Sequence, residues 1–224
     1  METKIFDSNG TSISYTKNGQ GENSRAIIFV HGNSEDNTLF AEISEKLAGE
    51  KFVVIAPDTR SHGKSSKVRR ISYGDIADDI VPLIMHEELE KPILFGFSDG
   101  GIVGLLLAIK YPNILSKLIV AGVNLSPKGI NGRWRVLIRL HHFFSRSDKM
   151  RLMLSDYNIT ADDLKQIKIP TIALYAEKDM VKKSHSELIV NNVANSEMKI
   201  IKGENHGSYV FDNQKLYDII TDDL

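Results

Sequence analysis

The 224-residue sequence has no cysteine, a single tryptophan and no long hydrophobic run. Without cysteine the chain can form no disulfide, no thiolate nucleophile and no cysteine-ligated zinc site. Its longest uninterrupted apolar stretch, residues 102–109, is far shorter than the roughly 20 residues that cross a membrane. The amino-terminal residues carry charges and turn formers where a signal peptide has an apolar core. We therefore expect a cytoplasmic protein with no membrane among its partners.

Neither sign of charge dominates the chain. It contains 28 Lys and Arg against 29 Asp and Glu, a formal net charge of -1, and 42% of its residues are hydrophobic. This composition is typical of a globular protein and predicts no nucleic acid among its partners. The length and the lack of an internal repeat predict a single domain over residues 1–224. Assembly into a homo-oligomer stays open.

Short β-branched and aliphatic runs alternate with helical patterns along most of the chain, which predicts an α/β fold. Residues 39–47 and 76–84 carry apolar side chains at the helical period, and residues 102–109 are apolar on every side, as a central buried helix would be. We predict a mostly parallel central sheet of about eight strands flanked by helices. The runs that we assign to strands are 13–16, 26–30, 52–56, 93–97, 118–121, 171–175 and 198–201.

The alternation of strands and helices stops between about residues 125 and 165. Within this region, residues 133–146 show one apolar stripe and one basic stripe at helical spacing. We predict a small helical lid inserted over residues 125–165. Its side chains Trp134, Leu137 and Phe144 are predicted to contact the substrate.

The strongest local motif is Gly96-Phe97-Ser98-Asp99-Gly100, which lies between a predicted strand and a predicted helix. A serine on a sharp turn from strand to helix needs small neighbours two residues away on each side, because a side chain there would collide with the turn. The motif predicts that Ser98 is a catalytic nucleophile. The alternative is an ordinary turn in which the serine caps the helix.

A serine hydroxyl is a weak nucleophile that needs a base, and an acid must hold that base in one tautomer. Asp179 and His206 each follow a predicted strand, so both should lie at the same edge of the sheet as Ser98. We predict that Asp179 is the catalytic acid and His206 the catalytic base. His185 is the first alternative for the base.

The segment Val30-His31-Gly32-Asn33-Ser34 follows another predicted strand. Attack of a serine on an ester carbonyl creates an oxyanion, and we predict that the backbone amides of Asn33 and Asp99 bind it. His31 is interpreted as a turn histidine with a structural role.

Two features bear on the charge of the substrate. The carboxylate of Asp99 could bind a substrate ammonium group, or it could complement the dipole of the helix that begins there. Residues 128–151 carry seven Lys and Arg and one acid. Such an excess is typical of a solvated face, and the alternatives are steering of anionic substrates and docking of an acidic partner. The two features favour opposite substrate charges, so both hypotheses stay open.

These motifs resemble the α/β-hydrolase superfamily in its serine-esterase branch, and within it the biphenyl hydrolase-like, or valacyclovir hydrolase-like, group. The resemblance covers nearly the whole chain, including the turn at Ser98, the order Ser98, Asp179, His206, and Lys110-Tyr111-Pro112. The chain departs from the pattern at Ser61 and Ala176, where relatives have glycine, and in its shorter lid.

The resemblance implies an α/β-hydrolase fold and a serine hydrolase that cleaves small carboxylic esters or related acyl compounds. Its substrates would be a small acyl molecule and water, with an acyl-serine intermediate and neither cofactor nor metal. One alternative is a carbon-carbon bond hydrolase or a cofactor-free perhydrolase, because the same three residues serve those reactions. Another is a non-catalytic ligand-sensing protein of this fold.

Overall fold

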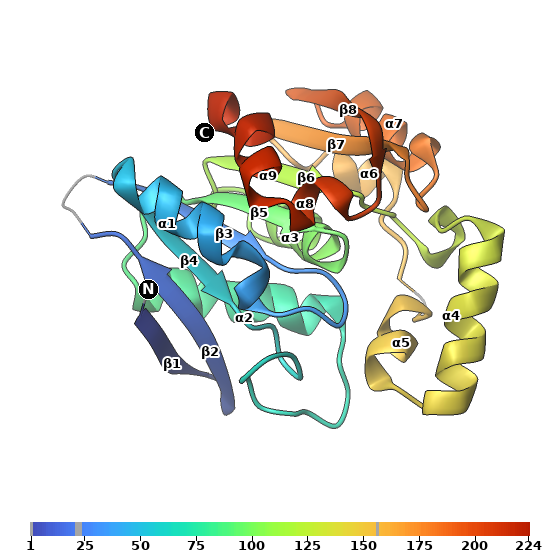
Figure 1. Cartoon of the computed structure of the whole chain (residues 1–224), viewed down its shortest axis with the longest axis horizontal. Helices are drawn as coiled ribbons and strands as arrows, with labels where there is room; N and C mark the ends of the chain where they lie inside the picture. Colours follow the sequence, from blue (N-terminus) through green and yellow to red (C-terminus); the bar gives the residue numbers. More distant parts are fainter. Residues whose placement is uncertain (1, 21–23, 156) are drawn as a thin grey trace.

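The computed structural model describes residues 2–20, 24–155 and 157–224. Within these residues eight strands form one sheet, in the order β1-β2-β4-β3-β5-β6-β7-β8 (Figure 1). The pairs β1-β2 and β2-β4 are antiparallel, and the other neighbours are parallel. The expected mostly parallel sheet is confirmed. Its strands are β1 (Glu2–Ser8), β2 (Thr11–Asn18), β3 (Arg25–Val30), β4 (Phe52–Pro57), β5 (Ile93–Phe97), β6 (Lys117–Ala121), β7 (Thr171–Lys178) and β8 (Ser196–Asn205).

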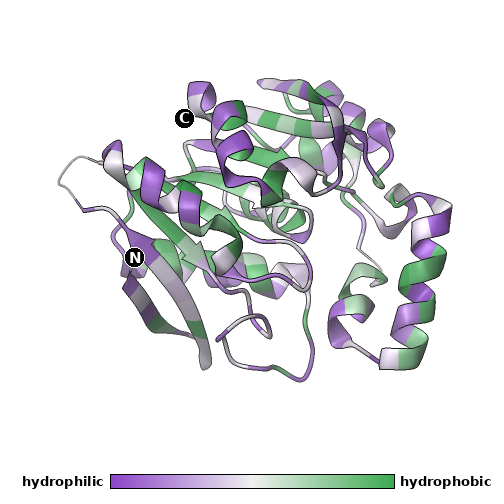
Figure 2. Ribbon diagram, viewed as in Figure 1, coloured by the Kyte–Doolittle hydropathy of each residue, from purple (hydrophilic) through white to green (hydrophobic). Residues whose placement is uncertain are grey.

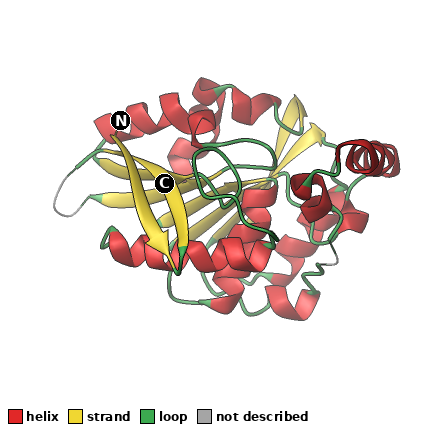
Figure 3. Ribbon diagram, turned by 90° about the horizontal axis from the view of Figure 1, so that it is seen from below, coloured by secondary structure: helices red, strands yellow, loops and turns green. Residues whose placement is uncertain are grey.

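Helices cover both faces of the sheet (Figure 3). The described helices are α1 (Ala41–Gly49), α2 (Tyr73–His86), α3 (Asp99–Lys110), α4 (Gly132–Ser145), α5 (Asp148–Met153), α6 (Ala161–Leu164), α7 (Lys183–Asn192), α8 (Ser208–Phe211) and α9 (Asn213–Ile220). Successive side chains of a strand point to opposite faces. Ile28 and Val30 of β3 therefore join the apolar cluster of α2 and α3, whereas Ile27 and Phe29 join that of α1 and α9.

The strands expected from the sequence each lie within one of the observed strands, but β1 was not predicted. Only Phe6 and Ser8 of β1 are buried, so this edge strand has no apolar run to reveal it. The expected helices are also found: residues 39–47 form a short 3₁₀ turn and α1, and residues 76–84 lie in α2. Residues 102–109 lie in α3, which is buried against the sheet as expected.

Residues 125–165 contain α4, α5 and α6 and, where described, no strand of the sheet. The helix expected over residues 133–146 is α4, which has no buried residue and lies at the outer edge of the molecule (Figure 1). Polar and apolar residues alternate along it (Figure 2). A helical segment is therefore present where expected, and its role as a lid stays a prediction. No helix of the described residues is long and apolar enough to cross a membrane.

The burial of α3 predicts a large difference between two leucine-to-alanine substitutions. Leu105 on α3 is 0% exposed and Leu137 on α4 is 54% exposed. We expect Leu105→Ala to lower the free energy of unfolding by about 2–5 kcal/mol, because it opens a cavity beneath the sheet. Leu137→Ala should change it by less than about 0.5 kcal/mol. Urea unfolding of both variants measures the difference, and equal losses would contradict this packing.

Candidate active site

Ser98 occupies a strained turn between β5 and α3. Its backbone has φ 52° and ψ -113°, a conformation that non-glycine residues avoid and that costs on the order of 1–3 kcal/mol. The surrounding hydrogen bonds hold it there: Ser98 N donates to Ala121 O on β6 at 2.8 Å, and Gly101 N donates to Ser98 O at 3.0 Å. Such a turn presents a side chain at the carboxyl end of the strand.

The turn requires the two glycines that flank Ser98. A Cβ on Gly96 would lie 2.3 Å from the carbonyl oxygen of Gly100, and a Cβ on Gly100 would lie 2.1 Å from the carbonyl oxygen of Val30. Both obstacles are backbone atoms, which cannot move aside as a flexible side chain can. Any side chain at position 96 or 100 would therefore collide with the backbone, which explains why a glycine stands two residues from Ser98 on each side.

The structure brings Ser98, Asp179 and His206 together. His206 Nε2 lies 3.1 Å from Ser98 Oγ, and His206 Nδ1 lies 2.7 Å from Asp179 Oδ1. Because a carboxylate only accepts, Nδ1 carries the proton that it donates to Asp179, and Nε2 is left to accept the proton of the serine hydroxyl. Asp179 Oδ1 also accepts the backbone N-H of Val181 at 2.8 Å.

The imidazole of His206 needs space that Gly122 provides. Gly122 follows β6 with φ +62°, and a Cβ there would lie 2.8 Å from Cε1 and 2.9 Å from Nδ1 of His206. No pattern in the sequence predicted this residue. Its signal in the sequence is weak, since many glycines follow strands without facing a catalytic histidine.

The predicted oxyanion-binding amides lie next to the serine. Asp99 is the first residue of α3 and directly follows Ser98. The loop that carries Asn33 lies close to Ser98, since a Cβ built on Gly32 would be 3.2 Å from the Cβ of Ser98. Within the described residues, no hydrogen bond from the backbone N-H of Asn33 or Asp99 is found. Their role as donors to an oxyanion stays a prediction.

The carboxylate of Asp99 is buried, and each of its oxygens accepts one hydrogen bond. Its Oδ1 accepts from the hydroxyl of Tyr73 at 2.8 Å, and its Oδ2 accepts from Nδ2 of Asn33 at 2.9 Å. Burial raises the pKa of Asp99 to about 6, although both hydrogen bonds oppose the change. These contacts favour a structural carboxylate at the start of α3 over a ligand for a substrate ammonium group.

The other histidines named in the sequence analysis have structural partners. His31 Nε2 accepts the N-H of Thr59 at 3.0 Å, and its Nδ1 lies 2.7 Å from Gly32 O. Burial lowers the pKa of His31, which keeps the ring neutral, as a turn histidine requires. His185 Nδ1 accepts the N-H of Leu125 at 3.0 Å, so the alternative base is engaged away from Ser98.

The predicted substrate contacts of α4 lie on an exposed helix. Trp134, Leu137 and Phe144 are 39%, 54% and 80% exposed. The ring contacts found among the described residues are with sequence neighbours: the guanidinium of Arg133 lies over the ring of Trp134, and Phe143 meets Phe144 edge to face. As substrate contacts they stay a prediction.

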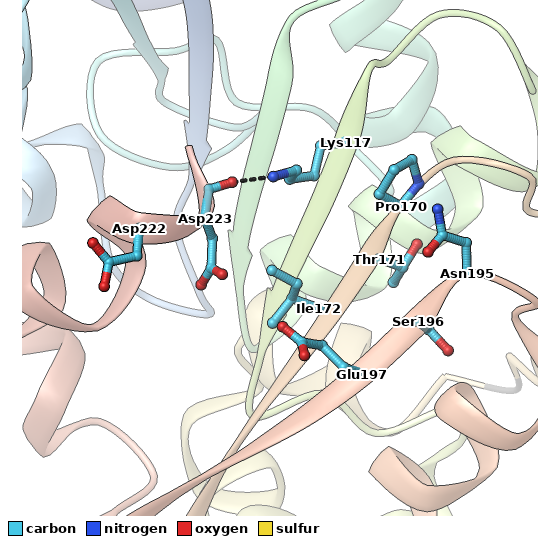
Figure 4. A pocket seen from close by; sticks show the side chains of 9 residues that line it. All are labelled: Lys117, Pro170, Thr171, Ile172, Asn195, Ser196, Glu197, Asp222 and Asp223. Atoms are coloured by element: carbon cyan, nitrogen blue, oxygen red, sulfur yellow. Dashed lines mark hydrogen bonds between the residues drawn. The ribbon is translucent and has the colours of Figure 1, made fainter.

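A cavity of about 340 Å³ lies at the other end of the sheet (Figure 4). It is lined by the first residues of three strands, Lys117 of β6, Thr171 of β7 and Ser196 of β8. Since Ser98 lies beyond the carboxyl end of β5, this cavity is separate from the candidate site. The described residues also hold no group of three or more His, Cys, Asp or Glu side chains that could bind a metal.

Comparison with known proteins identifies the family of the chain. A family model described as alpha/beta hydrolase fold matches residues 25–147, more than half of the chain. The chain belongs to this family. Serine hydrolase BPHL of Homo sapiens is 27% identical to this chain in an alignment of 232 residues. The alignment covers 90% of this chain and 79% of that protein. The sn-1-specific diacylglycerol lipase ABHD11 of Danio rerio is 32% identical over 112 residues, 49% of this chain and 34% of that protein.

Solved structures show the same fold. The esterase EaEST of Exiguobacterium antarcticum matches with a TM-score of 0.82 and 23% identity, covering 99% of this chain and 98% of that one. The resemblance inferred from the motifs is confirmed, and the protein is an α/β hydrolase whose relatives include serine hydrolases, esterases and lipases.

Glu35 is a second residue near the serine that the sequence analysis missed. Its Oε2 accepts the N-H of Gly32 at 2.9 Å. Glu35 and Ser98 both border Gly32. A Cβ built on Gly32 would lie 3.0 Å from Oε2 of Glu35 and 3.2 Å from the Cβ of Ser98. Burial raises the pKa of Glu35 to about 7, so the carboxyl group changes charge near neutral pH.

This pKa predicts a pH-dependent effect of Glu35→Gln on stability. The folded protein holds the Glu35 proton more tightly than the unfolded chain does. The wild type therefore loses stability as the pH rises from about 4.5 to about 7. Glutamine keeps the acceptor for Gly32 without this loss, so we expect the variant to gain about 2–3 kcal/mol over the wild type between about pH 4 and about pH 8.

Urea unfolding at several pH values measures this difference. Glu42→Gln is the matched control, because it replaces an exposed carboxylate on α1. If the free energies of unfolding of Glu35→Gln and the wild type differ by the same amount at every pH, the carboxyl group does not titrate as described.

Proposed function

We propose that this protein hydrolyses small carboxylic esters or related acyl compounds through an acyl-serine intermediate. The observation that carries the proposal is the hydrogen-bonded chain from Ser98 Oγ through His206 to Asp179 Oδ1. It lies at the carboxyl edge of the sheet, where α/β proteins place their reactive groups. The family to which the chain belongs supports the same chemistry.

In the first half of the reaction His206 Nε2 takes the proton of Ser98 as Oγ attacks the acyl carbon. Asp179 holds the imidazole by Nδ1 and stabilises the positive charge that develops on the ring. The amides of Asn33 and Asp99 donate to the oxyanion, and the amino end of α3 adds a favourable dipole. His206 then gives its proton to the leaving alcohol, and the acyl group remains on Ser98.

In the second half water replaces the alcohol. His206 Nε2 takes a proton from the water as it attacks the acyl-serine ester, and it returns that proton to Oγ when the acid leaves. The products are an alcohol and a carboxylic acid, and the enzyme is regenerated.

Labelling of the serine and turnover of esters together distinguish the functions that the sequence leaves open. Labelling of Ser98 by a fluorophosphonate, followed by turnover of a panel of short acyl esters, supports the proposal. Labelling without ester turnover favours the carbon-carbon bond hydrolase or the perhydrolase. A protein that is not labelled fits the ligand sensor.

Replacing the serine or the histidine tests the assignment directly. We expect Ser98→Ala and His206→Ala each to lower kcat for a short ester by on the order of 10⁴- to 10⁶-fold, because members of such a unit depend on one another. His141→Ala is the control, since this histidine is exposed on α4. Residual activity of either variant within about tenfold of the wild type would overturn the assignment.

The contacts of Asp99 predict how the enzyme treats substrate charge. Tyr73 and Asn33 already bind its two oxygens, so we expect Asp99→Asn to change kcat/KM of amino-acid esters and of neutral esters by similar factors. If the carboxylate instead binds a substrate ammonium, the variant should lose roughly ten- to a hundredfold of a preference for the cationic esters. Kinetics on ester pairs of equal size distinguish the two.

A further inference from the structure

The exposed apolar surface of the described residues is concentrated on α4. Six large side chains of this helix are 39–80% exposed: Trp134, Val136, Leu137, Leu140, Phe143 and Phe144. The other large exposed hydrophobic residues are scattered singly over different elements. Single exposed residues are ordinary, but a contiguous apolar patch marks an interaction surface. We call the last five of these residues the apolar face of α4, and Trp134 lies at its margin.

The packing of α4 turns this face away from the body of the protein. Val136, Leu140 and Phe143 follow helical spacing and form one stripe, with Leu137 and Phe144 beside it. Ile138 packs against the small cluster of Ile130, Met150 and Met153. Trp134, four residues before Ile138 and on the same side of the helix, is the least exposed of the six at 39%. The helix is therefore held by its other side, and no described residue covers the apolar face.

Positive charge surrounds this face. Residues 128–151 carry seven Lys and Arg and only Asp148 as an acid, although the whole chain has a net charge of -1. Arg135 and Arg139 lie together with Lys128 around a cavity of about 600 Å³ beside the helix. A helix with an apolar face and basic residues at its margin has the chemistry of a peripheral membrane-binding helix.

We propose that α4 docks on the surface of an anionic lipid bilayer. The apolar face enters the boundary between headgroups and acyl chains, while the arginines contact lipid phosphates. Charge complementarity favours this occupant over a second copy of the chain, because two copies joined through α4 would bring two basic regions together. The contact is peripheral, so it needs no spanning helix. The proposal departs from the expectation, drawn from the sequence, that no membrane is among the partners.

Docking through α4 would place the candidate active site near the lipid. The segment before α4 is tied to the loop that follows Asp179, since Asn131 N donates to Met180 O at 2.9 Å. After α4, the carbonyl oxygen of Lys149 in α5 accepts from Nδ2 of Asn33 at 2.9 Å. Both ends of the α4-α5 segment thus contact loops that carry predicted site residues.

Trp134 is the sole tryptophan of the chain, so its fluorescence reports on α4 alone. We expect vesicles of phosphatidylcholine with phosphatidylglycerol to shift its emission to shorter wavelength and to sediment the protein. Vesicles of phosphatidylcholine alone should do neither. Raising the salt from about 0.05 M to about 0.5 M should weaken binding, because the Debye length shortens. Equal binding to both vesicles, or none, would overturn the proposal.

Two double variants separate the apolar and the electrostatic contributions. Phe143→Ser with Phe144→Ser and Arg135→Gln with Arg139→Gln should each weaken binding to the anionic vesicles by about tenfold or more. Met85→Ser and Lys165→Gln are the matched controls, because they change exposed residues outside α4. Control variants that weaken binding as much as the α4 variants would contradict a specific role for this helix.

The rival occupant, a second copy of the chain, is tested by light scattering over a range of protein concentrations. A dimer that disappears in the Phe143→Ser, Phe144→Ser variant, together with no binding to vesicles, would assign the apolar face to self-association and overturn the proposal. These measurements involve no turnover, so their outcome is independent of the proposed hydrolase activity.

Discussion

The close packing of α3 against β5 and β3 is the constraint on which the candidate site depends. A Cβ at Gly96 or Gly100 would lie within 2.3 Å of a backbone oxygen, so only glycine permits the approach. That approach leaves Ser98 as the single residue between β5 and α3 and holds it at a positive φ. The cost of this strained backbone is offset by burial, since α3 packs apolar side chains against the sheet along most of its length.

The parallel sheet then brings distant residues to the serine. Ser98 and His206 are 108 positions apart, yet they meet because β5 and β8 end at the same edge. Asp179, after β7, approaches from the strand between β6 and β8. Gly122, after β6, leaves the space in which the imidazole lies. Four strand ends therefore define one site, and each contributes a residue whose position depends on the register of the sheet.

The sequence predicted the parts of the fold and site that have a local signal. Buried strands are continuous apolar runs, and the turn at Ser98 has glycines whose spacing follows from sterics. The edge strand β1 escaped prediction because few of its side chains are buried. Gly122 and Glu35 also escaped prediction. Their importance arises from a neighbour supplied by tertiary structure, the ring of His206 for one and the loop beside Ser98 for the other.

Helix α4 shows a different limit of prediction from sequence. The helix and its stripes follow from the sequence, but the side of the helix that packs against the rest of the protein does not. An amphipathic pattern predicts that the apolar stripe will be covered, and in a lid the nearest cover is the substrate site. In the structure Ile138 and the methionines of α5 hold the helix by another side. In this arrangement Trp134, Leu137 and Phe144 stay 39–80% exposed, so no packed wall of the described residues covers them. A second surface would cover them without moving the α4-α5 segment, so the hydrogen bond from Asn33 Nδ2 to Lys149 O could stay in place.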